Sequence, residues 1–77
     1  MRTIEKLQRV QEMLGTKDVN AVFYAITLRE SCLHLQGKIN SEDALVVANK
    51  LGIELVFEQN NGWLKGEKDG IEMCLTM

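Results

Sequence analysis

Two dipeptides near the C-terminus, Asn61-Gly62 and Asp69-Gly70, constrain the fold of this chain more than any other sequence feature. Asn-Gly and Asp-Gly are the pairs most typical of tight β-hairpin turns, because the central positions of those turns need a positive φ. Apolar and polar residues alternate on both sides of each pair, as they do in strands with one buried face. The sequence therefore predicts a three-stranded meander over residues 53–76.

The two dipeptides, taken as turn centres, also predict which residues of the three strands lie opposite one another. Phe57 is then opposite Gly66, Gly66 is opposite Met73, and Leu64 is opposite Leu75. Every residue of this set is apolar or glycine. Because a register error of one residue would bring polar side chains onto that face, the agreement supports the predicted meander.

Two segments have the pattern of amphipathic helices. Residues 3–14 carry apolar residues at spacings of three and four, with Thr3 as the expected N-cap. Residues 41–51 have a similar apolar face, and either Asn40 or Ser41 is placed to cap them. A glycine follows each segment and suits the C-terminal end of a helix. We expect both helices to pack with one face against a sheet.

The segment 20–38 fits two descriptions. Its alternating pattern predicts a hairpin with a turn at Glu30-Ser31, although neither residue favours a positive φ. The expected pairs are Leu28 with Leu33, Ile26 with Leu35 and Val22 with Ile39. The competing description is a helix, because several apolar residues of the segment also follow a helical spacing. The hairpin is the preferred prediction.

Together these elements predict one small α+β domain over residues 1–77. We expect two layers, with two helices packed on an antiparallel-rich sheet and the element order αββαβββ. A chain of this length buries only about 60% of the surface that its unfolded form exposes. The core is therefore expected to be small, and no small-molecule ligand is identified.

Composition excludes several classes of protein. Apolar residues make up 45% of the chain and charged residues 26%, which is typical of a folded domain and not of a disordered one. The net charge of −2 does not favour nucleic acid or an anionic membrane as the partner. No apolar run approaches the roughly 20 residues that span a bilayer, and the N-terminus lacks the features of a signal peptide. We expect a cytoplasmic protein with reduced cysteines.

No catalytic or metal-binding motif is evident. Cys32 and His34 would share one face of a strand, but nothing in the sequence supplies an oxyanion hole or a carboxylate to orient the histidine. A zinc site would need Cys32, His34 and Cys74 together with Glu72 or Asp43, from distant segments and without a close cysteine pair. The prediction is therefore no enzyme, no metal and no cofactor.

Four stretches between residues 33 and 76 follow a pattern met elsewhere. They are Leu35-Gln36-Gly37, a short helix ending at Gly52, the turn Asn61-Gly62-Trp63, and the run from Gly70-Ile71 to Leu75-Thr76. Together they resemble small uncharacterised proteins of gut Bacteroidetes and their mobile elements. The resemblance implies no activity, because that group has no assigned function. It implies a hairpin–helix–meander fold and a bacterial cytoplasm.

The sheet face turned away from the helices is the predicted binding surface. The registers above place Phe23, Val56 and Trp63 on that face, where polar side chains are the norm. Exposed apolar patches mark association, and Trp is enriched at binding hot spots. We therefore expect a protein–protein interaction or homodimerisation module. The alternative is a nucleic-acid-binding accessory of a mobile element that uses Lys65 and Lys68 beside Trp63, although acidic residues surround both lysines.

Overall fold

A computed structural model describes residues 2–77 of the chain and has three helices and five strands over those residues. In chain order these elements are α1 (Thr3–Leu14), α2 (Val19–Val22), β1 (Phe23–Leu28), β2 (Leu33–Lys38), α3 (Glu42–Leu51), β3 (Val56–Glu58), β4 (Trp63–Lys68) and β5 (Ile71–Thr76). The predicted α+β class and the order αββαβββ are confirmed. The single helical turn α2 is an addition to the two helices that the sequence predicts.

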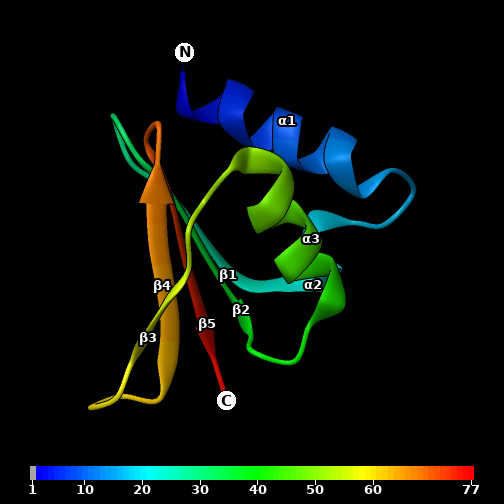
Figure 1. Cartoon of the computed structure of the whole chain (residues 1–77). Coiled ribbons are helices and arrows are strands. Elements are labelled where there is room, and N and C mark those ends of the chain that lie inside the picture. The colour runs from blue at the N-terminus through cyan, green and yellow to red at the C-terminus, as the bar shows by residue number, and fades with distance from the viewer. Residues whose placement is uncertain (1) are drawn as a thin grey trace.

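The strands form one sheet in the order β1-β2-β5-β4-β3, in which β2 and β5 are parallel and the other neighbours are antiparallel. All three helices lie on one side of this sheet (Figure 1). We call that side the helix face; it carries the fully buried residues Leu33, Leu35, Met73 and Leu75. The opposite side is the outer face, and none of the helices in residues 2–77 covers it.

The second turn of the meander has the predicted form. Asp69 and Gly70 both have positive φ, 52° and 77°, as a tight hairpin turn of this type requires. Gly66 lies opposite Met73, and Leu64 lies opposite Leu75. The predicted register of β4 and β5 is therefore confirmed.

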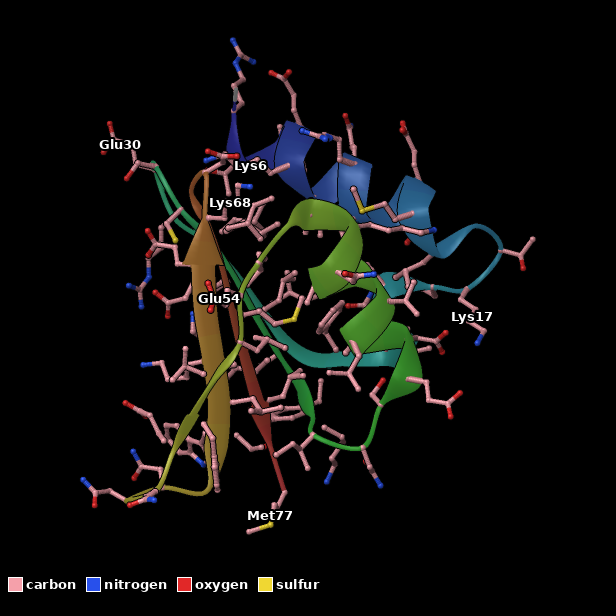
Figure 2. All side chains as sticks on the ribbon, viewed as in Figure 1. Lys6, Lys17, Glu30, Glu54, Lys68 and Met77 are labelled. Carbon is pink, nitrogen blue, oxygen red and sulfur yellow. The ribbon has the colours of Figure 1, made fainter. Side chains whose placement is uncertain are left out.

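The first turn of the meander differs from the prediction. Phe57 lies opposite Leu64 and not opposite Gly66, so residues 59–62 form a longer loop. The reason lies at Gly66, where the chain leaving α3 crosses β4 with the backbone of Glu54 directly over the glycine (Figure 2). Because the crossing chain occupies that position, β3 can pair with β4 only beyond it. The shift is an even number of residues, so Phe57 keeps the predicted face.

Residues 20–38 contain a helical turn followed by the hairpin. The side chain of Asp18 caps α2 by accepting a hydrogen bond of 2.9 Å from the backbone N–H of Asn20. The predicted pairs Leu28–Leu33 and Ile26–Leu35 are confirmed. The predicted pair of Val22 with Ile39 is wrong, because Val22 belongs to α2.

Contacts from α1 support the turn between β1 and β2, which has no residue that favours a positive φ. The Thr3 hydroxyl donates hydrogen bonds to the backbone carbonyls of Arg29 and Glu30. The Lys6 ammonium donates to the carbonyl of Ser31 at 3.2 Å. Thr3 is thus the first residue of the helix and not its N-cap, which corrects the sequence expectation.

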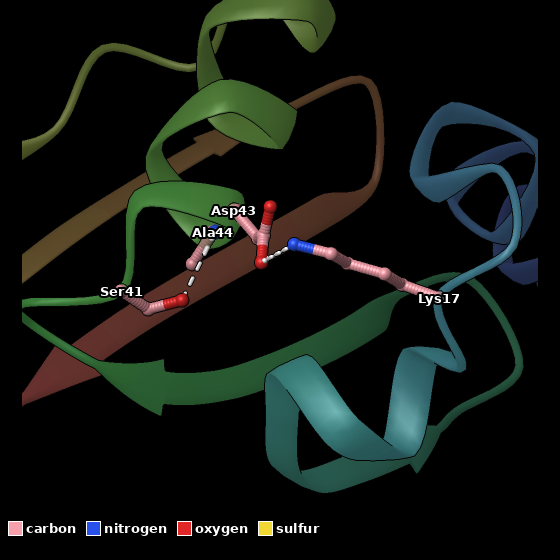
Figure 3. A network of polar contacts seen from close by, with 4 residues as sticks. All are labelled: Lys17, Ser41, Asp43 and Ala44. Carbon is pink, nitrogen blue, oxygen red and sulfur yellow. Dashed lines mark hydrogen bonds and ion pairs between the residues drawn. The ribbon is translucent and has the colours of Figure 1, made fainter.

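Local signals set both ends of α3. The Ser41 hydroxyl accepts a hydrogen bond of 3.2 Å from the N–H of Ala44, and Gly52 takes the left-handed conformation after the last turn. Lys17, in the loop after α1, forms an ion pair of 2.7 Å with Asp43 in the first turn of α3 (Figure 3). α3 lies beside α1 above the helix face, and the two helices are in contact.

Candidate partner-binding site

Phe23 does not lie on the predicted binding surface. A β-bulge between Phe23 and Ala25 shifts the pairing with β2, so that Phe23 lies opposite Gly37 on the helix face. The Phe23 side chain is 1% exposed and belongs to the core. A Cβ added to Gly37 would lie 3.2 Å from Phe23 Cδ1, so the glycine makes room for the ring. The placement of Phe23 on the outer face was therefore wrong.

Val56 and Trp63 do lie on the outer face, where the sequence places them. Val56 in β3 is opposite Lys65, and Trp63 in β4 is opposite Glu58. The Val56 side chain is 61% exposed, and Trp63 is half-buried. Both residues are at the β3 side of the sheet, so the candidate surface is centred on this edge and not on the middle of the outer face.

Phe57 is the residue of this surface that the sequence analysis missed. It is next to Val56 in β3 and points to the helix face, yet it is 52% exposed. The predicted pairing with Gly66 would have brought it over the core, but the crossing chain at Glu54 fills that place. Its apolar character beside an Asn-Gly turn gave no signal that distinguished it from a core residue. We call Val56, Phe57 and Trp63 the β3 patch.

β3 is an edge strand of three residues, with β4 as its one neighbour. The side of an edge strand that has no neighbour presents backbone N–H and C=O groups that can pair with another chain. Folded proteins commonly protect such edges with charged residues, proline or bulges. Here two of the three strand residues are apolar and exposed, one on each face, and only Glu58 carries a charge.

The middle of the outer face is polar. His34 Nδ1 is 2.8 Å from Glu72 Oε1, which joins β2 to β5. Cys32, Glu67 and Glu72 have possible ligand atoms that all lie within 4.8 Å of one another. This set differs from the one considered from sequence, since His34, Cys74 and Asp43 are not part of it. It offers one sulfur and two carboxylates, fewer than the four ligands of a structural zinc site.

The two cysteines are both free thiols in different environments. Cys74 lies in β5 on the outer face and is only 2% exposed, because the neighbouring side chains cover it. This burial raises the pKa of the Cys74 thiol. Cys32 is partly exposed, and its sulfur contacts the backbone carbonyl of Leu33 at 3.8 Å. Neither thiol is hydrogen-bonded to His34 among the described residues.

Lys65 and Lys68, the lysines of the nucleic-acid alternative, lie on opposite faces of β4. Lys65 is opposite Cys74 on the outer face, whereas Lys68 is opposite Ile71 on the helix face. Only Lys65 therefore shares a face with Trp63, and Glu58 lies directly opposite that tryptophan. The two lysines do not form one basic surface with the aromatic ring.

Comparisons with protein-family models, with curated proteins and with solved structures find no match for this chain. The resemblance to small proteins of gut Bacteroidetes therefore remains a prediction, as does the cytoplasmic location. None of the helices in residues 2–77 is long and apolar enough to cross a membrane. The candidate site thus depends on the geometry described above.

Proposed function

We propose that this protein is a small non-catalytic module that forms a homodimer through the edge of β3. The supporting observation is that neighbouring residues of this edge strand, Val56 and Phe57, are 61% and 52% exposed on opposite faces of the sheet. A partner lying flat on one face would cover only one of them. A strand pairing edge to edge with β3 covers both and also satisfies the free backbone groups.

A second copy of the chain suits this edge because the strand is self-complementary. In an antiparallel β3–β3 pair related by a two-fold axis at Phe57, each Val56 lies opposite the Glu58 of the other copy, and the two Phe57 rings face each other. Aromatic pairs across strands are favourable, whereas like charges directly opposite each other are not. This register brings the aromatic rings together and keeps the two Glu58 carboxylates apart. Trp63 borders the pair on the outer face.

The non-catalytic part of the proposal is supported by the separation of the possible nucleophiles from the histidine. Among the described residues, the Cys32 sulfur contacts a backbone carbonyl, and neither thiol is hydrogen-bonded to His34, although Glu72 contacts His34 Nδ1. A nucleophile activated by a neighbouring base would require the histidine within hydrogen-bond reach of the thiol. The buried Cys74 thiol has a raised pKa, which disfavours the reactive thiolate.

The test is the molar mass in solution, measured by size-exclusion chromatography with light scattering over a concentration series in reductant. The wild-type chain is expected at twice the mass of one chain. Val56→Lys and Phe57→Lys place a charge at the edge and are expected to give monomers, and Trp63→Ala is expected to weaken the dimer without unfolding. Val46→Lys is the matched control, since Val46 is 48% exposed on α3, away from β3.

Two outcomes would overturn the proposal. One is a wild-type monomer at millimolar concentration. The other is a dimer that persists in both β3 variants or that is lost equally in Val46→Lys, because association would then use another surface. Circular dichroism of each variant shows whether a monomer is still folded.

A further inference from the structure

A pocket of about 270 Å³ lies where α1, the end of α3 and the β4–β5 turn meet, and its charge is opposite to that of the whole chain. Its charged lining is Lys6, Arg9, Lys50, Lys68 and Asp69. The pocket thus gathers four of the nine basic residues of the chain but only one of the eleven acidic residues. Figure 2 shows Lys6 and Lys68 at the same end of the sheet, although they come from α1 and β4.

Among residues 2–77, no carboxylate forms a direct ion pair with any of these four cations. The ion pairs among residues 2–77 are Lys17–Asp43 and His34–Glu72, and neither involves the pocket. The chain has eleven acidic residues for nine basic ones, yet only Asp69 of the acidic residues lines this pocket. Four like charges around one pocket repel one another, and an anion in the pocket would relieve that repulsion.

Lys6 is the most constrained of the four cations. Its side chain is 8% exposed, and its Nζ donates to the backbone carbonyls of Ser31 at 3.2 Å and Gly70 at 3.5 Å. An ammonium group has three N–H donors, so one donor of Lys6 remains for a ligand. The two carbonyls hold the ammonium in place without cancelling its charge.

The C-terminus of α3 explains how the cations stay together without a ligand. Lys50 is in the last turn of this helix, where the helix dipole favours positive charge. Lys68 reaches the same helix end, since a Cβ added to Gly52 would lie 2.8 Å from Lys68 Nζ. The partial negative charge of the helix end offsets part of the repulsion between these two lysines.

We infer that the pocket is a binding site for a compact phosphate-bearing ligand. Lys and Arg are the side chains that bind phosphate, as point charge and as bidentate donor respectively. The volume is just below the range of about 300–1,000 Å³ for small-molecule sites, which suits a compact ligand, and Leu51 and Ile71 add an apolar wall for the carbon part of a phosphate ester. A nucleic-acid backbone would need a basic stripe along the surface, whereas these cations converge on one pocket. The site is independent of association at β3, which pairs with the other end of β4.

The test compares ligands on the full-length chain by thermal unfolding and calorimetric titration. Inorganic pyrophosphate and a phosphomonoester are the probes, inorganic phosphate alone tests whether the organic part matters, and chloride at equal ionic strength is the control. A probe at a hundredfold excess over its Kd is expected to raise Tm by roughly 11–22 °C. A short DNA duplex is also titrated, to compare a nucleic-acid backbone with the small phosphate probes.

Lys68→Met and Lys65→Met are a matched pair, because both remove one lysine from β4 but on opposite faces. Lys68→Met is expected to weaken pyrophosphate binding about tenfold or more, and Lys65→Met to leave it within about twofold. Arg9→Gln tests the pocket independently, since Arg9 is exposed on α1 and anchors no turn. The inference is overturned if no phosphate probe raises Tm beyond chloride, or if both lysine variants lose affinity equally. Tighter binding of DNA than of either small probe would overturn the assignment to a compact ligand.

Discussion

Two glycines on the helix face of the sheet should respond with different losses of stability to the same substitution. Gly66 in β4 and Gly37 in β2 both have ordinary strand conformations without a positive φ. A Cβ added to Gly66 would overlap the backbone oxygen of Glu54 and lie 2.7 Å from Ile53 Cγ2. A Cβ added to Gly37 would lie 3.2 Å from two side-chain atoms, of Leu75 and of Phe23. The added Cβ would therefore meet mainly backbone atoms at Gly66 and mainly side-chain atoms at Gly37.

The expected magnitudes follow from this difference. Gly→Ala at a compatible position stabilises a protein by about 0.4–1 kcal/mol, because it restricts the unfolded chain. Forcing extra volume into a packed site costs about 1–3 kcal/mol when the surroundings must shift. At Gly66 the backbone crossing from α3 must move, so Gly66→Ala should lower the free energy of unfolding by about 1–3 kcal/mol. At Gly37 the two terms nearly cancel, so Gly37→Ala should stay within about 1 kcal/mol of wild type.

The assay is urea unfolding at constant temperature, followed by circular dichroism and by the fluorescence of Trp63. A domain of this length has a free energy of unfolding of about 4–12 kcal/mol, so the Gly66→Ala loss is measurable as a lower midpoint. In a thermal scan each kcal/mol corresponds to roughly 4–8 °C. Equal stability of Gly66→Ala and wild type would refute the reasoning, because the chain after α3 would not then press on β4. A larger loss for Gly37→Ala than for Gly66→Ala would do the same.

Three further predictions use the same unfolding assay. Phe23→Ala should cost about 3–5 kcal/mol because the ring is fully buried, whereas Val56→Ala at the exposed edge should change the monomer by less than about 0.5 kcal/mol; equal effects would contradict the bulge. Ser41→Ala should cost about 1 kcal/mol through loss of the cap on α3, and Ser41→Asp should restore most of it. Burial raises the pKa of Cys74 above its ordinary value of 9.0, so the unfolded thiol ionises first and the free energy of unfolding should fall as pH rises past that value. Cys74→Ala should reduce that fall, and an unchanged pH slope would exclude the thiol as its source.

Short stretches of the sequence predict much of the fold. The Asp69-Gly70 turn, the Ser41 cap and the glycine after α3 each meet a requirement of the local backbone, either a positive φ or an acceptor for a free N–H. The registers of β4 with β5 and of most of β1 with β2 follow from alternation, because a slip of one residue would expose the core. These features need no knowledge of distant residues.

The candidate partner-binding site was only partly predictable. Val56 and Trp63 lie on the outer face because strand alternation places them there. Phe23 lies on the other face because a bulge interrupts the alternation, and Gly37 opposite it leaves room for the ring. Phe57 is exposed because the chain crosses β4 at Gly66. Neither the bulge in β1 nor the crossing over β4 can be recognised from the pattern of apolar and polar residues.

The class of the fold, most helix ends and the faces of most strands follow from the amino-acid sequence alone, because each depends on periodicity or on a local backbone requirement. Where segments distant in the chain meet depends on the packing of the elements against one another. The three pocket lysines, Lys6, Lys50 and Lys68, are far apart in the chain. Each of them, considered alone, is interpreted as a solvated surface charge. They line one pocket because α1 docks on the two turns through the carbonyls of Ser31 and Gly70, and because the end of α3 reaches β4. This proximity results from the packing of helices and strands against one another, and no local sequence pattern predicts it.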